Sequence, residues 1–432
     1  MEKKISKVRK IKGELRVPSD KSISHRSIIL TSLADGISNI KNFLKAGDTL
    51  TTLNVYRKLG VSINEEKGIL KVKGVNFKGY KEPEDILDMG NSGTTTRLTL
   101  GLLSGQDFFS SLTGDESLRQ RPMGRVVEPL RSMGAKIDGR QDGKLLPLSV
   151  RGSYLKGIQF FNKRSSAQVK SALLIAGLLA EGETKVIEPY MSRDHTEKML
   201  QAMGADIKIY KSDHYLVTIT GSKTLNAIDI DVPADPSSAA FFAAAAVLIP
   251  DSELVLKDVL INPTRDGFFR KLKEMGGNIE YLNKREKAKE PVADIYVRYS
   301  PYLKGIAIKK EDVPSMVDEI PLISLLATQA EGETVITGAE ELRVKESDRI
   351  KAVVNNLKNL GIHVEELPDG MIINGRQKVK GGVVDSYKDH RIAMGFSILA
   401  LISEEGIKIK DADSVFISYP EFYEHLEKII SN

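Results

Sequence analysis

Several short stretches of the sequence place Lys and Arg where a helix is expected to begin. The stretch "PSDKSISHR" offers typical N-cap residues, Ser19 and Asp20, ahead of apolar residues at helical spacing. A helix N-terminus carries partial positive charge and favours acidic residues in its first turn, yet Lys21, His25 and Arg26 stand there. A solvated basic face would explain one such turn. Otherwise the excess of cations predicts a place where anions bind.

The same feature recurs at other predicted helix starts. The glycine turn in "GNSGTTTR" contains Asn91 and Gly93, with Arg97 close by, and offers backbone N–H groups to an anion, although it is not a Walker A loop. Further examples are "LTGDESLRQRPMGR", "SSAQVK", "MSRDHTE", "RVKESDR" and "DHRIAM". A surface ion pair or a cap would explain any one of them. Their recurrence in register with a repeat indicates a shared function in anion binding.

The charge of these cations fits two small phosphorylated carboxylates. Such a pair would bring roughly −5 to −6 in total, since each phosphate carries about −1.5 to −2. The two anions repel each other in water, so bringing them together needs compensating charge. The candidate cations are Lys21, Arg26, Arg121, Lys345, Arg349 and Arg391.

An internal repeat supplies the elements that position these residues. Five predicted helices end in Gly before a strand ("YRKLGVSI", "LRSMGAKI", "LQAMGADI", "LKEMGGNI" and "LKNLGIHV"), with starts 74, 70, 72 and 85 residues apart. Six copies of a second helix-to-strand turn, from "SLADGISNI" to "ALISEEGIKI", interleave with them. This spacing is too long for a solenoid repeat and predicts six small α/β units.

The ends of the chain are predicted to fold together. The sixth unit stops after the helix in "YPEFYEHLEKIIS", and the N-terminal strand "KVRKIKGELRVP" is available to complete it. We therefore expect two lobes of three units: a continuous lobe of residues 21–234, and a discontinuous lobe of residues 1–20 and 235–432. The charged stretch "NKREKAKEP" is expected to be a solvated hairpin tip.

The composition excludes several classes of protein. The 432 residues include no Cys, which excludes disulfides, thiol nucleophiles and Cys-based zinc sites, and the six His show no close pair at metal-ligand spacing. No metal and no cofactor are therefore expected. The longest apolar run, "AAFFAAAAVLI", is shorter than the roughly 20 residues that span a membrane, and the N-terminus is not a signal peptide. We expect a cytoplasmic monomer with no membrane or nucleic-acid partner.

Together, the motifs resemble those of the 5-enolpyruvylshikimate-3-phosphate synthase family, from residue 18 to the C-terminal helix. The stretches that carry the resemblance are "PSDKSISHR", "GNSGTTTR", "LTGDESLRQRPMGR", "SSAQVK", "RDHTE", "NPTR", "RVKESDR" and "DHRIAM", and several are similar to the class II branch. The resemblance implies an α/β (α+β) fold of two lobes, each of three βαβαββ repeats, with helix starts facing a cleft. The implied reaction transfers the enolpyruvyl group of phosphoenolpyruvate to the 5-hydroxyl of shikimate 3-phosphate and releases phosphate by addition and elimination. It belongs to the shikimate pathway, which leads to chorismate and the aromatic amino acids.

The resemblance also implies roles for particular residues. Asp318 matches the base for the attacking hydroxyl, Glu346 matches the acid that protonates the methylene carbon, and Lys21 would touch both small-molecule substrates. The implied shikimate 3-phosphate ligands are Lys21, Ser22, Arg26, Ser166, Gln168, Ser192, Asp318 and Lys345. The implied phosphoenolpyruvate ligands are Lys21, Asn91, Gly93, Arg121, Gln168, Arg349, His390 and Arg391.

Three positions depart from the family pattern. Ile417 stands where the other branch carries a phosphoenolpyruvate-binding Lys, Ala167 replaces a substrate-binding Ser, and Glu341 stands where Asn is common. Gly93 is retained where a side chain crowds the inhibitor glyphosate. The resemblance therefore implies that glyphosate competes with phosphoenolpyruvate.

Two other functions stay open at this stage. The sister enolpyruvyl transferase that acts on UDP-N-acetylglucosamine shares the two-lobed architecture, but it generally uses a loop Cys, which this chain lacks. A non-catalytic polyanion-binding module would use the basic helix ends, and its binding would fall steeply with salt. The aromatic content of 6% and the lack of Trp give little support for base stacking.

Overall fold

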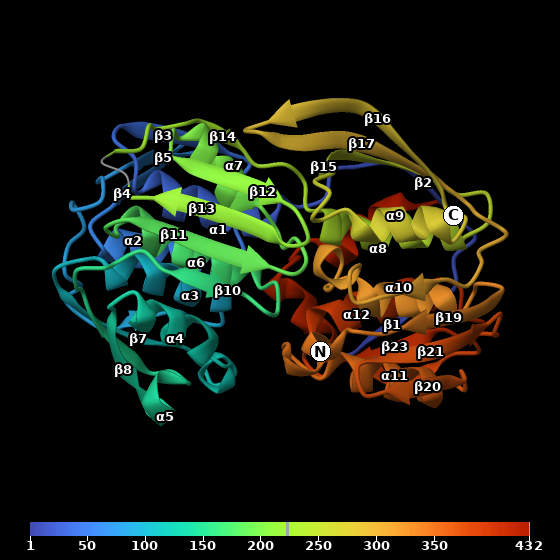
Figure 1. The fold of residues 1–432 in the computed structure, drawn as a ribbon. Coiled ribbons are helices and arrows are strands. Elements are labelled where there is room, and N and C mark those ends of the chain that lie inside the picture. The colour runs from blue at the N-terminus through green and yellow to red at the C-terminus, as the bar shows by residue number, and fades with distance from the viewer. Residues whose placement is uncertain (222–223, 432) are drawn as a thin grey trace. The chain divides into compact units, whose positions relative to one another are not determined.

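The computed structural model describes residues 1–221 and 224–431, which fall into two compact units (Figure 1). The terminal unit comprises Met1–Pro18, Pro233–Glu286 and Pro291–Asn432, and the central unit comprises Ser19–Val232 and Lys287–Glu290. The crossings between the units thus lie two residues before the positions expected from the sequence. The segment Lys287–Glu290 was expected in the other lobe. Its place in the central unit follows from contacts such as the ion pair of Lys287 with Asp231, 2.7 Å.

Three four-stranded sheets build the central unit, and they share one strand order. The first is β14 (Ile230–Asp231), β3 (Ile37–Lys41), β5 (Ile69–Lys73) and β4 (Ser62–Glu66). The second is β6 (Leu87–Asp88), β7 (Phe109–Thr113), β9 (Leu148–Arg151) and β8 (Lys136–Gly139). The third is β10 (Gln159–Phe161), β11 (Glu183–Glu188), β13 (Tyr215–Thr220) and β12 (Ile207–Lys211). In each sheet the first two strands are parallel and the other neighbours antiparallel, as a βαβαββ unit requires.

Buried helices fill the interior of the central unit. Helix α3 (Gly93–Ser104) packs against α1 (Lys21–Thr31) and α6 (Ala167–Leu178), and Figure 1 shows these helices with sheets around them. Every residue of α6 from Val169 to Leu178 is buried, including Lys170. The other helices of this unit are α2 (Gly47–Lys58), α4 (Gly124–Ser132), α5 (Arg140–Gly143), α7 (His195–Ala202) and the 3₁₀ helix η1 (Leu118–Gln120).

The terminal unit repeats this plan with modified edges. One sheet is β16 (Asn278–Lys287), β17 (Glu290–Arg298), β15 (Glu253–Leu260), β2 (Lys10–Leu15) and β24 (Ile430–Ser431). Another is β18 (Ala307–Ile308), β19 (Gly332–Ile336), β21 (Gly370–Gly375) and β20 (Val364–Leu367). The last is β1 (Lys3–Ile5), β23 (Ile407–Lys410) and β22 (Gly382–Asp385).

The N-terminal strand that completes the sixth unit is not the one expected from the sequence. The stretch "KVRKIKGELRVP" contains β2, which pairs in parallel with β15, from Lys12 opposite Glu253 to Leu15 opposite Leu256. It therefore supplies the first strand of the fourth unit. The three-residue strand β1 pairs antiparallel with β23 and takes the last place in the sixth unit. The prediction was therefore wrong by one strand, although β2 also pairs antiparallel with β24, which follows the last helix of the chain.

Three buried helices also fill the terminal unit. They are α8 (Pro236–Leu248), α10 (Ile320–Ala327) and α12 (His390–Ala400), which pack against one another. The long apolar run of the sequence lies in α8, and it is buried. Among the described residues, no helix combines the length and apolar character needed to cross a membrane. The other helices are α9 (Gly267–Glu274), α11 (Arg349–Asn359), α13 (Phe422–Ile429), η2 (Val313–Ser315), η3 (Glu340–Val344) and η4 (Ala412–Ile417).

Candidate functional site

The predicted site residues gather at helix N-termini within each unit. In the central unit Lys21 and Gly93 are the first residues of α1 and α3, and Gln168 is the second residue of α6. In the terminal unit Arg349 opens α11 and His390 opens α12. The first turns of these helices, all within the described residues, contain no acid. Positive helix ends and cationic side chains therefore coincide, which suits anionic ligands.

The caps of these helices differ in one respect that matters for a ligand. Asp20 caps α1 by accepting from the backbone N–H of Ile23 at 2.7 Å, and Asp389 caps α12 by accepting from that of Arg391 at 2.8 Å. Ser166 precedes α6 but makes no cap hydrogen bond through its side chain in the described structure. The first N–H groups of α6 are therefore suited to binding an anion.

Guanidinium groups surround the glycine turn of α3. Arg121 donates to the side-chain oxygen of Asn91 at 2.6 Å and to its carbonyl oxygen at 3.2 Å. Arg97 is buried and donates to the side-chain oxygen of Gln168. A Cβ added to Gly93 would lie 3.0 Å from Nη1 of Arg97 and 3.9 Å from Nη1 of Arg121. The lack of a side chain at Gly93 thus keeps both guanidinium groups close to the start of α3.

The two predicted cations of α1 already have partners within the central unit. Lys21 Nζ lies 3.1 Å from Oδ2 of Asp48, with the Lys side chain 26% exposed. Arg26 is buried and donates to Thr196 Oγ1 at 2.8 Å and to Ser171 Oγ at 2.9 Å. Arg26 therefore joins α1 to α6 and α7 in addition to any contact with a ligand.

His25, counted as a cation from the sequence, is buried and neutral. Its Nδ1 lies 2.7 Å from Oγ1 of Thr52. Burial lowers the pKa of His25 to about 3, and Asp48 only partly opposes this. At neutral pH the charge at the start of α1 therefore comes from Lys21 and Arg26.

A His25→Gln variant is expected to change how stability depends on pH. In the unfolded chain His25 should titrate near pH 6.5, whereas the folded protein keeps it neutral down to about pH 3. The unfolded state therefore binds more protons between these values, and stability falls as the pH drops below 6.5. At pH 5 the contribution lost is about 2 kcal/mol.

The measurement is urea unfolding of both proteins at pH 7 and pH 5. The stability difference between wild type and His25→Gln should shrink by about 2 kcal/mol at the lower pH. An equal difference at both pH values would mean that His25 is charged in the folded state.

In the terminal unit, Arg349 holds together the predicted base and the predicted acid. Its buried guanidinium donates to Asp318 Oδ1 at 3.2 Å, to Glu346 Oε2 at 2.7 Å and to Asp389 Oδ2 at 2.8 Å. Burial alone would lower the pKa of Arg349, but these carboxylates outweigh burial and raise it. Arg349 in turn holds the pKa of the buried Asp389 carboxyl below its ordinary value, against the effect of burial. Carboxylates from three separate segments thus converge on one cation.

Arg391 is the predicted cation whose donors the protein satisfies least. It is buried, and its Nη1 lies 3.6 Å from Oε1 of Glu319, so the ion pair is loose. Neither Nε nor Nη1 has a hydrogen-bond partner among the described residues. His390, the preceding residue, is also buried, and Lys345 Nζ lies 3.8 Å from Oε1 of Glu341. Unmet donors on a buried guanidinium suit an anionic ligand.

One cluster has the donor types of a metal site. Ligand atoms of the buried residues Asp194, His195 and Glu290 all lie within 4.8 Å of one another. However, His195 Nδ1 lies 2.7 Å from Glu290 Oε1, and Asp194 is ion-paired with Lys198. These direct contacts explain the cluster without a metal. The stretch "NKREKAKEP" lies at the tip of the hairpin of β16 and β17, and residues 283–286 are exposed as expected, whereas Glu290 is buried in the central unit.

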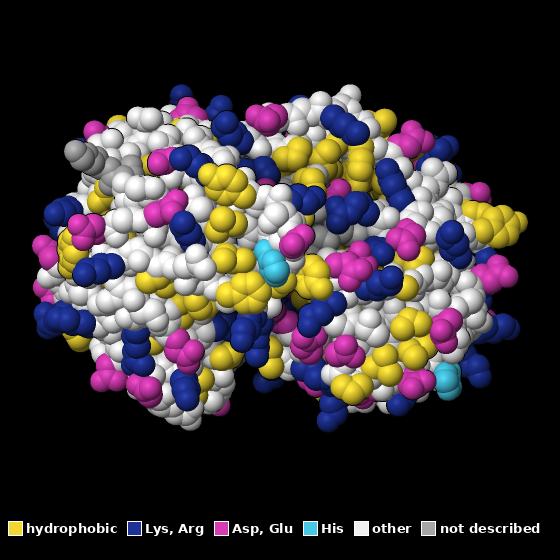
Figure 2. Space-filling view, in the orientation of Figure 1, with side chains coloured by type: hydrophobic (Ala, Val, Ile, Leu, Met, Phe, Trp, Pro, Cys, Tyr) yellow, Lys and Arg dark blue, Asp and Glu magenta, His cyan; other side chains and the backbone are white. Residues whose placement is uncertain are grey.

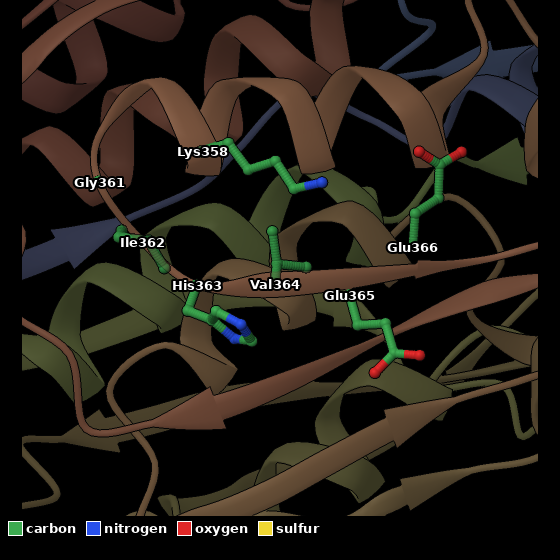
Figure 3. A pocket seen from close by; sticks show the side chains of 7 residues that line it. All are labelled: Lys358, Gly361, Ile362, His363, Val364, Glu365 and Glu366. Atoms are coloured by element: carbon green, nitrogen blue, oxygen red, sulfur yellow. The ribbon is translucent and has the colours of Figure 1, made fainter.

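A surface cavity of about 650 Å³ lies over strand β20, away from these groups in the sequence. Its lining residues are Lys358 and residues 361–366. Figure 3 shows His363 and Glu365 on one side of the strand and Glu366 on the other. The two Glu carboxylates would repel a phosphate, so this cavity does not suit the predicted substrates.

Comparison with known proteins identifies the family. The family model described as EPSP synthase (3-phosphoshikimate 1-carboxyvinyltransferase) matches residues 5–426. The chain belongs to the EPSP synthase family. A relative from Persephonella marina, named 3-phosphoshikimate 1-carboxyvinyltransferase, is 88% identical over 100% of both chains. One of the same name from Aquifex aeolicus is 54% identical over 99% of both chains.

A solved EPSP synthase supports the fold. The structure from Acinetobacter baumannii has a TM-score of 0.88 and 44% sequence identity, and the match covers 99% of this chain and 98% of that one. Together with the six small sheets, this likeness confirms the α/β fold predicted from the sequence.

The predicted EPSP synthase residues divide between the two units and form a central group and a terminal group. The central group is Lys21, Ser22, Arg26, Asn91, Gly93, Arg121, Ser166, Gln168 and Ser192. The terminal group is Asp318, Lys345, Glu346, Arg349, His390 and Arg391. Among the buried charged residues that contact these groups, Arg97, Glu188 and Asp389 were missing from the predicted ligands.

Sequence signals for these missed residues exist. Arg97 ends "GNSGTTTR" and Asp389 begins "DHRIAM". Glu188 occupies an inward position of strand β11, whose side chains alternate between inside and outside. An acid at an inward strand position was the available signal, because acids are rarely buried without a partner.

Proposed function

We propose that this chain is a 3-phosphoshikimate 1-carboxyvinyltransferase. It transfers the enolpyruvyl group of phosphoenolpyruvate to the 5-hydroxyl of shikimate 3-phosphate and releases inorganic phosphate. The convergence of Asp318 and Glu346 on the guanidinium of Arg349 is the observation that carries this proposal. The name of the 88% identical relative supports it.

The proton transfers divide between the two carboxylates. Asp318 accepts the proton of the 5-hydroxyl as its oxygen bonds to C2 of phosphoenolpyruvate, while Glu346 gives a proton to C3. In the second step C2 loses phosphate, C3 returns its proton to Glu346, and the proton that Asp318 accepted leaves with the phosphate, which restores both carboxyl groups. Arg349 favours the ionised form of both acids, whereas bound anions favour protonation of a neighbouring carboxyl group. Substrate binding therefore prepares Glu346 to act as the acid.

The cations hold the anionic groups of the two substrates. We assign phosphoenolpyruvate to Arg121, Arg391 and the start of α3, and the 3-phosphate of the other substrate to Ser166 and Ser192. Buried donors on Arg391 and the start of α6 support these assignments.

The test measures inorganic phosphate released from phosphoenolpyruvate in the presence of a chelator. One reaction contains shikimate 3-phosphate and the other UDP-N-acetylglucosamine. Release with the shikimate ester alone is the expected result. Release only in the reaction with the UDP sugar, or no release in either reaction, would refute the proposed function.

The two alternatives have less support. The UDP-N-acetylglucosamine reaction is not favoured, because the matched family and the curated relatives carry the other name. A polyanion-binding module would present a continuous basic surface. On the face in Figure 2, Lys and Arg side chains of both units alternate with Asp and Glu. The expected monomeric state and cytoplasmic location remain predictions, and sedimentation velocity would test the first.

A Gly93→Ala variant is expected to weaken phosphoenolpyruvate binding. The new Cβ would lie 3.0 Å from Nη1 of Arg97, so this buried guanidinium must move by a few tenths of an ångström, which disturbs its hydrogen bond to Gln168. Losing one charge-assisted hydrogen bond raises KM for phosphoenolpyruvate on the order of tenfold, and the inhibition constant of glyphosate should rise as well. Gly47→Ala is the control, because a Cβ there meets nothing within 4 Å. Equal KM values for both variants would contradict this role of Gly93.

A further inference from the structure

A buried carboxylate lies next to the serines assigned to the 3-phosphate. Glu188 is the last residue of strand β11 and is fully buried within the central unit. A buried charge is strongly unfavourable unless it is paired and hydrogen-bonded. The reaction proposed above does not use Glu188, so its place in the core needs another explanation.

Four hydrogen-bond donors converge on Glu188. Oε1 accepts from Asn162 Nδ2 at 2.7 Å, and Oε2 accepts from Lys170 Nζ at 3.0 Å and from the backbone N–H of Ser192 at 3.2 Å. The hydroxyl of Ser192 lies 2.8 Å from Oε1 and 2.9 Å from Oε2. Asn162, Lys170 and Ser192 are themselves buried.

The same partners reach both serines. Asn162 Nδ2 also donates to the carbonyl oxygen of Ser166 at 3.0 Å, and Asn162 Oδ1 accepts from the backbone N–H of Ser166 at 3.3 Å. Lys170 Nζ donates to the carbonyl oxygen of Ser192 at 3.3 Å. Glu188 therefore fixes Ser192 directly and Ser166 through Asn162, although the two serines are far apart in the sequence.

Lys170 supplies the positive charge that compensates Glu188. Burial alone would lower the pKa of Lys170, but Glu197, 2.7 Å away, and Glu188 outweigh burial and raise it. Burial raises the pKa of Glu197. Lys170 therefore stays charged at neutral pH.

We infer that Glu188 is a positioning residue for the phosphate of shikimate 3-phosphate, acting through Ser192 and through Asn162 on Ser166. This inference rests on the proposed function. A hydroxyl has one proton to donate, and in the structure that of Ser192 is directed to Glu188. When phosphate binds, this hydroxyl can turn toward it, while Asn162, Lys170 and the Ser192 N–H keep Glu188 in place. Ser192 is thereby positioned to bind the phosphate, and the buried carboxylate of Glu188 stays paired.

The test is a Glu188→Gln variant in the full chain. The amide has one acceptor oxygen, and its NH₂ group would face the donor of either Asn162 or Lys170, so the arrangement of donors cannot persist. KM for shikimate 3-phosphate is expected to rise about tenfold to hundredfold, the effect of losing a hydrogen bond to a charged group. KM for phosphoenolpyruvate should change by less than about twofold. Partial unfolding alone would lower kcat and leave both KM values unchanged.

Glu183→Gln is the matched control, because Glu183 lies in the same strand but is partly exposed and paired with Lys185. It should leave both KM values unchanged. Ser192→Ala completes a double-mutant cycle. If Glu188 acts partly through Ser192, the double variant should raise KM for shikimate 3-phosphate by less than the product of the single changes. If the rise in KM of the double variant equals the product of the two single rises, action through Ser192 is contradicted.

A second variant keeps the inference testable if Glu188→Gln fails to fold. Glu188→Asp keeps the charge but shortens the side chain, so it cannot reach all four donors, and the same rise in KM is expected. A folded variant of either kind with unchanged KM for shikimate 3-phosphate overturns the positioning role. A wild-type protein that releases no phosphate would instead refute the proposed function, so the two failures are distinguishable.

Discussion

Replacing Asp318 by Asn is expected to lower kcat by a factor on the order of 10²–10⁴ while both KM values stay nearly unchanged. The amide oxygen can still accept the hydrogen bond that Arg349 donates at 3.2 Å, but it cannot take the proton of the attacking hydroxyl. Glu346→Gln should have an effect of similar size, because its amide oxygen can accept from Arg349 but has no proton for C3. The measurement is steady-state phosphate release with each substrate varied in turn.

Two acids of the terminal unit that lie outside the predicted site, the partly exposed Asp312 and the exposed Glu340, provide controls for these variants. Asp312→Asn removes the ion pair of Asp312 with Lys271, and Glu340→Gln removes the weak contact of Glu340 with Lys310. Neither change should alter kcat by more than about twofold, because partly exposed ion pairs contribute little. A fully active double variant, with both Asp318→Asn and Glu346→Gln, would overturn the assignment of base and acid.

Replacing Arg349 by Met is expected to abolish activity and to lower the free energy of unfolding by about 3–5 kcal/mol. The substitution keeps most of the side-chain volume but leaves Asp318, Glu346 and Asp389 without the cation that they share. Three carboxylates would then repel one another in a partly buried space. Urea unfolding of variant and wild type gives the difference.

The pH dependence of this variant gives a second readout. Without Arg349, burial and mutual repulsion favour the protonated carboxyls in the folded state, which raises their pKa above the unfolded values. Stability is then lost as the pH rises, so the defect should be smaller at pH 5 than at pH 8. Arg298→Met, which removes an exposed ion pair with Glu280, should cost less than about 1 kcal/mol at either pH. A defect in Arg349→Met that does not depend on pH would contradict the shared-cation arrangement.

The sequence allowed much of the fold to be predicted, because its signals were local. The Gly that follows five predicted helices and the six interleaved helix-to-strand turns mark the units along the chain. Which N-terminal strand enters which sheet could not be predicted, since both β1 and β2 are short and pairing depends on distant partners. The same limit explains why residues 287–290 were placed in the other lobe.

The candidate site was predictable in its residue types but not in its contacts. The resemblance named Arg349 as a substrate ligand, whereas the structure shows its N–H groups donating to Asp318, Glu346 and Asp389. Glu346 is only three residues from Arg349, but Asp318 and Asp389 are distant in sequence, so no spacing pattern could reveal that all three acids converge. The neutrality of His25 was equally hidden, because it depends on burial.

Phosphorus NMR of the wild-type protein with both substrates tests the proposed reaction most directly. The signal of phosphoenolpyruvate should decrease as that of inorganic phosphate grows in equal amount, while one phosphate ester signal, that of the shikimate compound, is retained. An unchanged spectrum, or loss of the shikimate ester itself, would contradict enolpyruvyl transfer by this protein.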